Sequence, residues 1–186
     1  MHINVHCALG IILSMIFLDY LNLFQIALII TVSILIDFDF VFSKYAKDHN
    51  HRRLPTHSFI PFLIFLPFGL VFIEFLWVGI VGIFHVILDL VDWGIYPLTP
   101  RVKDKIIGGF LFVPEVKEGD EPLNKCYFIN TYYGSKIIIV LEIIAFLGAI
   151  LLIIWRNLFY LILLVPYFLF LALHLITYFK YCKNKK

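Results

Sequence analysis

The chain has 186 residues, of which 62% are hydrophobic and only 15% are charged, and its mean hydropathy is +0.95. These values exclude a soluble globular domain and are typical of an integral membrane protein that crosses the bilayer several times. The net charge is only +2. We assume no nucleic-acid partner, and we expect a protein of this class to contact membrane lipids.

Six apolar stretches are long enough to form helices in a hydrocarbon layer about 30 Å thick. They cover residues 3–18, 21–36, 58–76, 78–95, 136–155 and 158–179. We therefore predict an all-α fold, a single membrane domain over residues 1–186 with six transmembrane helices. The first two stretches are short for a bilayer, so they would tilt, thin the bilayer or form a partly inserted hairpin.

The basic residues are distributed unevenly along the chain. If the second, fourth and sixth helices end on the same side, 14 of the 15 Lys and Arg residues lie there and only Arg156 lies opposite. The positive-inside rule then places both termini and both long loops in the cytoplasm, and the protein in the plasma (inner) membrane. Cys7, Cys126 and Cys182 would lie near this reducing side and form no C-x-x-C pair, so we expect neither a disulfide nor a metal site from them.

The first two predicted helices each have ionisable residues at their cytoplasmic ends. His6 lies near the start of the first helix, and Asp37-Phe38-Asp39 ends the second. A helix C-terminus is the negative end of the helix dipole, so two carboxylates there need a positive neighbour. A divalent cation would meet this need, because aspartates supply hard oxygen ligands.

The third predicted helix begins after Thr56-His57-Ser58, which places His57 at the level of His6 and Asp37. Arg52 and Arg53 precede it. Two explanations of these arginines have equal weight. They could bind phosphate, or they could only contribute to the general excess of basic residues in cytoplasmic loops.

His85, Asp89 and Asp92 lie in the fourth predicted helix at positions i, i+4 and i+7, which share one helix face. Ionisable groups inside a membrane are costly, so they are usually paired, bound to metal or exposed to a polar cavity. Asp89 would lie about one turn from the cytoplasmic interface. We therefore expect a shallow cavity on the cytoplasmic side.

The connection over residues 96–135 is too long for a simple loop. Ile106–Val113 and Cys126–Tyr133 are rich in aromatic and β-branched residues, so we predict a small hairpin with a bend at Gly108-Gly109. This hairpin would lie over the cavity as a lid.

Seven ionisable side chains thus fall in the cytoplasmic halves of four predicted helices: His6, Asp37, Asp39, His57, His85, Asp89 and Asp92. A mixed set of imidazoles and carboxylates suits Zn²⁺, Mn²⁺ or Fe²⁺, and the surplus of ligands suggests two ions that share a carboxylate. The alternative is a neutral, hydrogen-bonded polar core without metal.

Four motifs resemble those of a known family, the membrane-bound metal-dependent hydrolases first described among LexA-regulated inner-membrane proteins. They are the early His6, Asp37-Phe38-Asp39, Arg53-Leu54-Pro55-Thr56-His57-Ser58, and His85-x-x-x-Asp89 with the following Gly94-Ile95-Tyr96-Pro97. The resemblance covers about the first 100 residues.

The order and spacing of these residues also resemble zinc-dependent phospholipase C and related single-strand nucleases. The resemblance implies one metal site formed by Asp37, His57, His85 and Asp89, with His6 and a bridging Asp89 at a second. In that family a further His and an H-x3-E pair bind a third metal, and this sequence has neither after Asp92.

We therefore predict a membrane-bound, metal-dependent hydrolase whose substrate is a phosphoester, such as a phospholipid from the inner leaflet. The cofactor would be one or two divalent transition-metal ions, Zn²⁺ ahead of Mn²⁺ or Fe²⁺, and the ligands His6, Asp37, His57, His85 and Asp89. Asp39 or Asp92 would accept a proton from metal-activated water, and Arg53 would stabilise phosphoryl charge. The alternatives are a metal-ion transporter and a non-enzymatic scaffold in which metal ties the helices together.

Overall fold

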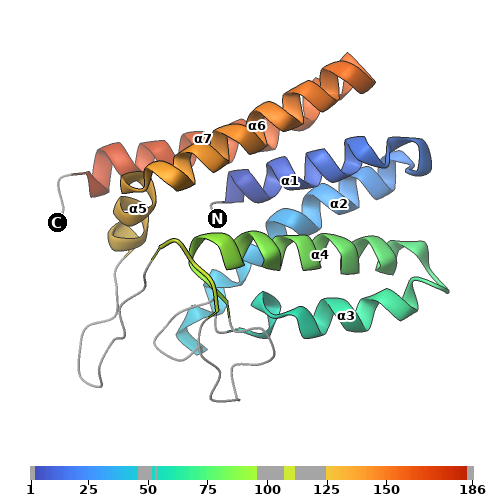
Figure 1. Ribbon diagram of the computed structural model, residues 1–186, viewed down its shortest axis with the longest axis horizontal. Coiled ribbons are helices and arrows are strands. Elements are labelled where there is room, and N and C mark those ends of the chain that lie inside the picture. Colours follow the sequence, from blue (N-terminus) through green and yellow to red (C-terminus); the bar gives the residue numbers. More distant parts are fainter. Residues whose placement is uncertain (1–2, 46–51, 53, 96–106, 112–124, 184–186) are drawn as a thin grey trace.

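The computed structural model of the protein describes residues 3–45, 52, 54–95, 107–111 and 125–183 (Figure 1). Over these residues the fold is helical, which confirms the all-α class, and the single β pairing among them is a bridge between Ile95 and Ile107. The helices are α1 (Ile3–Ile16), η1 (Leu18–Tyr20), α2 (Leu23–Leu35), η2 (Ile36–Tyr45), η5 (Pro55–His57), α3 (Phe59–Phe68), α4 (Ile73–Asp92), α5 (Lys125–Gly134), α6 (Lys136–Arg156), η6 (Leu158–Leu163), α7 (Leu164–Thr177) and η7 (Tyr178–Cys182).

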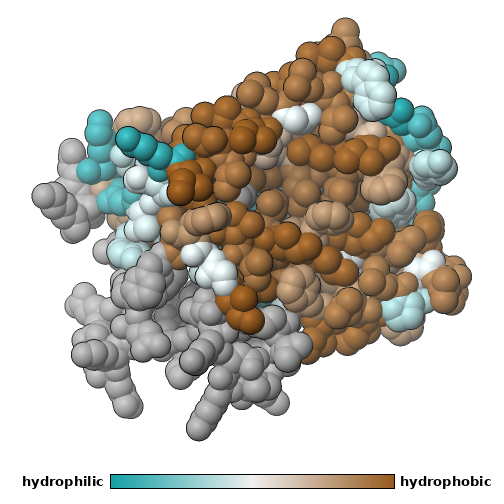
Figure 2. Space-filling model, viewed as in Figure 1, coloured by the Kyte–Doolittle hydropathy of each residue, from teal (hydrophilic) through white to brown (hydrophobic). Residues whose placement is uncertain are grey.

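Within the described residues, four helical stretches are long and apolar enough to cross a membrane. They are Leu23–Tyr45, Ile73–Asp92, Lys136–Arg156 and Leu158–Cys182. Helices α1 and α3 are apolar but shorter, with 14 and 10 residues. Hydrophobic side chains cover most of the coloured surface in Figure 2, and hydrophilic ones gather towards its two ends. This distribution is the one expected of a membrane protein.

Helix α1 lies at the centre of the bundle, in contact with α2, α4, α6 and α7. Helices α6 and α7 lie on one side of α1, and α4 and α3 lie on the other (Figure 1). The start of α1, helix α5 and the C-terminal end of α7 lie at the same end of the bundle (Figure 1). Because α1 lies between these two groups of helices, polar residues near its start can reach both α4 and α6.

Helix α2 begins at a capping box, and together with η2 it forms a helical stretch to Tyr45 that is longer than predicted. The Asn22 side chain accepts a hydrogen bond from the Gln25 N–H at 2.9 Å, and the Gln25 side chain accepts one from the Asn22 N–H at 3.1 Å. These bonds satisfy N–H groups that have no partner within the helix. After Leu35 the chain tightens into η2, which contains Asp37 and Asp39.

Residues 107–111 cover the C-terminal end of α4. The amides of residues 109–111 donate hydrogen bonds to the carbonyl oxygens of residues 90–92 at 2.7–2.9 Å, which satisfies carbonyls that end the helix. The predicted bend is present, since Gly108 and Gly109 have φ of +79° and +97°. This conformation favours glycine.

The predicted hairpin is wrong in its second half, because Cys126–Tyr133 lies in helix α5. In α5, Tyr132 is fully buried and packs in a cluster with Trp93, Leu111 and Ile138. Packing of this kind outweighs the strand preference of aromatic residues. The remainder of the predicted lid, residues 96–106 and 112–124, lies outside the described residues.

The prediction that no cysteine pairs is also wrong. Cys126 and Cys182 form a disulfide, with their Cα atoms 4.9 Å apart and a sequence separation of 56. Helix α7 returns the chain along α6 to the end of the bundle where α5 lies (Figure 1), which brings the two thiols together. Cys7 is a free thiol in the apolar core.

Candidate metal centre

Five side chains from four separate segments converge at the end of the bundle where α1 begins. His6 comes from α1, Asp37 from η2, His57 from η5, and His85 and Asp89 from α4. The three imidazoles and Asp89 are fully buried, and Asp37 is 6% exposed. The structure thus places in one cluster the five residues that the sequence singles out as metal ligands.

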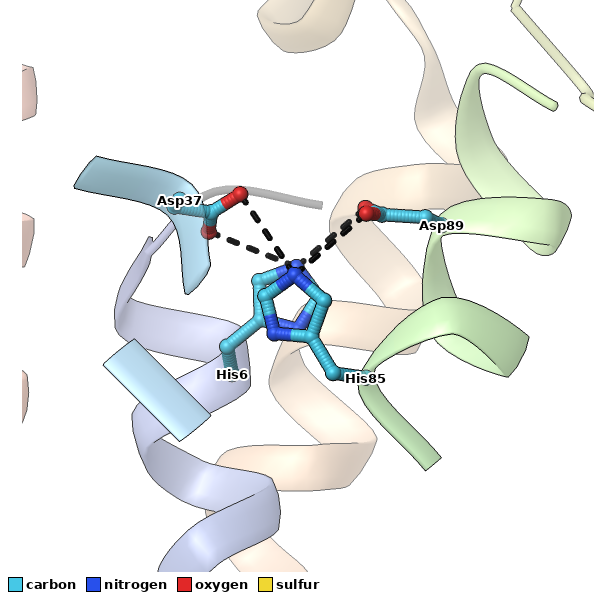
Figure 3. A group of neighbouring side chains, drawn as sticks. All are labelled: His6, Asp37, His85 and Asp89. Atoms are coloured by element: carbon cyan, nitrogen blue, oxygen red, sulfur yellow. Dashed lines mark ion pairs between the residues drawn. The ribbon is translucent and has the colours of Figure 1, made fainter. Parts of the chain in front are cut away.

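Each imidazole presents its Nε2 atom to both carboxylates. Nε2 of His6 lies 3.6 Å from Asp37 and 3.3 Å from Asp89. The corresponding distances are 3.5 and 3.3 Å for His57, and 3.6 and 3.4 Å for His85. Figure 3 shows Asp37 and Asp89 pointing from opposite sides at the nitrogens of His6 and His85, whose rings are stacked with centroids 3.7 Å apart.

These distances fit a shared metal ion better than direct hydrogen bonds. They exceed the usual N–H···O range, but two ligand atoms each about 2.1 Å from the same ion lie about 3.0–3.6 Å apart at ligand angles of about 90–120°. One ligand atom from each of His6, Asp37, His85 and Asp89 lies within 4.8 Å of the others. Among the described residues, no hydrogen-bond partner is found for Nε2 of His6, Nε2 of His85 or Oδ2 of Asp37, although all three atoms are buried. This buried group could therefore hold a metal ion.

Two of the imidazoles are oriented by contacts at their other ring nitrogen. Nδ1 of His85 lies 3.0 Å from the carbonyl oxygen of Ser33. Nδ1 of His57 lies 3.0 Å from Oδ2 of Asp39, which also accepts a hydrogen bond from the Thr56 hydroxyl. A proton on Nδ1 in both residues leaves the Nε2 lone pair directed into the cluster, as metal binding requires. Asp39 thus lies behind His57, away from the centre of the cluster.

Arg52 also belongs to the site, although only Arg53 is among the predicted site residues. Its side chain is 8% exposed, and Nη1 lies 2.9 Å from Oδ1 of Asp89 and 3.3 Å from Oδ1 of Asp92. Burial alone would lower the pKa of the guanidinium, but the two carboxylates raise its pKa above the ordinary value, so Arg52 is charged. Asp92 also accepts a hydrogen bond from the N–H of Trp93 at 2.7 Å. Arg53, the predicted phosphoryl-binding residue, lies outside the described residues.

The only sequence signal for Arg52 is its position beside Arg53, five residues before His57. The residue types are the same, so the sequence pattern cannot distinguish between the two arginines. The structure places the Arg52 guanidinium against α4.

A second buried polar group lies on another face of α1. The Asn4 side chain donates a hydrogen bond to Oε1 of Glu142 at 2.5 Å, and the Tyr132 hydroxyl donates one to Oε2 at 2.8 Å. Burial and the neighbouring carboxylate both raise the pKa of Tyr132, so the phenol stays protonated and donates. Asn4 and His6 are two residues apart and therefore about 200° apart around the helix. These hydrogen bonds give Glu142 a structural role that joins α1, α5 and α6.

No protein-family model, curated protein or solved structure matches the chain. The functional assignment therefore depends on the sequence motifs and on the geometry of the cluster.

Proposed function

We propose that the protein is a membrane-bound, metal-dependent hydrolase of a phosphoester, such as a phospholipid that reaches the cluster from the membrane. The main support is the arrangement of three imidazole Nε2 atoms, each 3.3–3.6 Å from both Asp37 and Asp89. Nitrogen and carboxylate ligands together are typical of hydrolytic metal sites. The resemblance of the surrounding motifs to membrane-bound metal-dependent hydrolases agrees with this proposal.

In this proposal the metal ligands are His6, Asp37, His57, His85 and Asp89. A divalent ion, when bound there, supplies Lewis acidity and lowers the pKa of water. The Ser33 carbonyl and Asp39 hold His85 and His57 in the tautomer that binds metal. Because Asp39 is engaged with His57 and Thr56, and Asp92 with Arg52, positioning roles are favoured over the proton-accepting roles that the sequence suggested.

The second candidate is a metal-ion transporter, which would need a polar route from the cluster to the opposite face. Beyond the cluster, one to two turns further along α1, α2 and α4, the buried side chains of Leu13, Ile29, Trp77 and Val81 pack together. Among the described residues, the route is thus filled by apolar side chains. This packing favours the hydrolase over the transporter.

Four membrane-length helices support a location in a membrane. We propose the plasma (inner) membrane, with the cluster on the cytoplasmic side, because 14 of the 15 basic residues would lie on that side. A phospholipid substrate would then come from the inner leaflet.

The experiment that tests the function measures metal content, hydrolysis and metal flux on the same preparations. The full chain is purified in detergent without chelator, and His85→Ala is compared with His174→Ala, a histidine variant outside the cluster. We expect about one metal equivalent and hydrolysis of a generic phosphodiester or of inner-leaflet phospholipids from wild type and His174→Ala. His85→Ala should lose most of both.

Other results would select a different function. Folded, active wild-type protein without metal would rule out the metal centre. Metal-loaded protein that hydrolyses none of these esters but conducts the ion into proteoliposomes would be a transporter. Metal-loaded protein that is inactive in both assays would favour a scaffold.

A further inference from the structure

The guanidinium of Arg52 occupies a defined place between two carboxylates of α4. Asp89 and Asp92 are three residues apart, so their side chains project from neighbouring positions on the same helix face. A single nitrogen of Arg52, Nη1, lies 2.9 Å from Oδ1 of Asp89 and 3.3 Å from Oδ1 of Asp92. All three residues are buried, so this contact lies inside the protein.

Asp89 connects the guanidinium to the imidazole cluster. Its Oδ2 atom faces Nε2 of His57 at 3.3 Å and Nε2 of His85 at 3.4 Å. Its Oδ1 atom faces Arg52 and, at 3.3 Å, Nε2 of His6. In a dinuclear metal site, one carboxylate can lie between two metal ions. Here Asp89 lies in the same way between the imidazole cluster and the guanidinium of Arg52, which occupies the place of the second ion.

We infer that Arg52 is the second cation of this centre, so that the protein binds one metal ion and not two. The inference rests on the proposed metal site and specifies its composition. A second ion bridged by Asp89 would need the same Oδ1 atoms of Asp89 and Asp92 that Nη1 of Arg52 contacts. A divalent ion and one guanidinium together balance the three negative charges of Asp37, Asp89 and Asp92, which matters because these carboxylates are buried. Asp39, the fourth carboxylate, lies at the opposite nitrogen of His57.

A purely structural ion pair would behave differently from a second cation. If Arg52 only positions Asp89, its removal should weaken metal binding and leave the number of bound ions unchanged. If Arg52 takes the place of a cation, its removal exposes two carboxylate oxygens to a new ion. The number of ions bound therefore separates the two roles.

The test is the metal stoichiometry of the full-length protein at saturating Zn²⁺ or Mn²⁺. We expect one equivalent in wild type and two in Arg52→Ala. Arg52→Lys retains the positive charge and should bind one. The double variant Arg52→Ala/Asp92→Asn removes a carboxylate that the second ion needs, and should also return to one. Arg156→Ala is the matched control, because Arg156 pairs with Asp19 (Nη2 to Oδ2, 2.5 Å) beyond the far end of α1, and it should bind one.

Electron paramagnetic resonance of Mn²⁺-loaded wild type tests the inference even if Arg52→Ala does not fold. An uncoupled Mn²⁺ signal is expected, whereas the exchange-coupled signal of a metal pair would overturn the inference. Two equivalents in wild type, or one weakly held equivalent in folded Arg52→Ala, would also overturn it. Wild type that binds no metal would instead refute the proposed metal site itself, so the two failures are distinguishable.

Discussion

His57 is held between two carboxylates, with Asp37 facing Nε2 and Asp39 facing Nδ1. The contact at Nδ1 selects the tautomer and raises the basicity of Nε2. We therefore predict that Asp39→Asn, which retains the shape of the side chain, lowers metal affinity by about 10- to 100-fold. Metal competition with a calibrated chelator would measure this change.

The matched control for this variant is Asp19→Asn, because the Asp19 side chain is 71% exposed and pairs with Arg156. Its metal affinity should equal that of wild type. Unchanged affinity in Asp39→Asn would mean that Asp39 does not orient His57.

Asp89 is the carboxylate that faces all three imidazoles, at 3.3–3.4 Å. Asp89→Asn removes its charge, so bound metal should fall below about a tenth of the wild-type content. Metal also stabilises the folded state, by about 3 kcal/mol when free metal is about 100 times Kd. A chelator should therefore lower the Tm of wild type and leave the Tm of Asp89→Asn almost unchanged. Equal chelator effects on both proteins would contradict a metal role for Asp89.

The position of His6 depends on the close contact between helices α1 and α2. A Cβ atom at Gly10 would lie 2.5 Å from Oγ of Ser33 and 3.0 Å from Cα of Ile30, so the helices approach at a residue without a side chain. We predict that Gly10→Ala destabilises the protein by about 1–3 kcal/mol. It should also weaken metal binding, because α1 contains His6.

Gly148 in α6 supplies the matched control for this prediction. A Cβ atom there would meet its nearest neighbour, Cδ1 of Ile12, at 3.7 Å, which is an ordinary contact. Thermal unfolding and metal content should be near wild type in Gly148→Ala. Equal stability of the two alanine variants would show that α1 and α2 do not need this close approach.

Two features of the whole molecule favour opposite orientations of the protein in the membrane. By the positive-inside rule, the excess of basic residues favours a cytoplasmic position for the His/Asp cluster, whereas a disulfide between Cys126 and Cys182 is typical of an oxidising compartment. Helix α5, which contains Cys126, and the start of α1, which contains His6, lie at the same end of the bundle (Figure 1). No single orientation can therefore satisfy both of them, unless the cysteines are reduced in the cell.

We predict the cytoplasmic orientation, in which the cysteine pair is reduced in the cell and forms the disulfide on exposure to air. In intact cells, a membrane-impermeant thiol reagent should label neither Cys126 nor Cys182, even after treatment with an impermeant reductant. Both should be labelled after lysis and reduction, while the buried Cys7 needs denaturation. Labelling in intact cells after external reduction would place the metal cluster outside the cytoplasm.

Features that depend on local pattern could be predicted from the residues alone. Long apolar stretches specify membrane helices, and the spacing of His85 and Asp89 puts them on one face of α4, because hydropathy and helical period are properties of neighbouring residues. His6, Asp37 and His57 could be predicted to lie near them, because each is at the cytoplasmic end of its predicted helix. Their function as metal ligands remains a prediction.

The contacts between residues that are distant in sequence could not be predicted in this way. Arg52 and Arg53 are chemically equivalent in the sequence, and only the path of the chain brings Arg52 to Asp89. The return of α7 along α6 brings Cys126 to Cys182, and burial of Tyr132 against Trp93 selects a helix where the composition suggested a strand. Contacts of this kind depend on how helices pack across the whole chain, and neither residue type nor spacing records that packing.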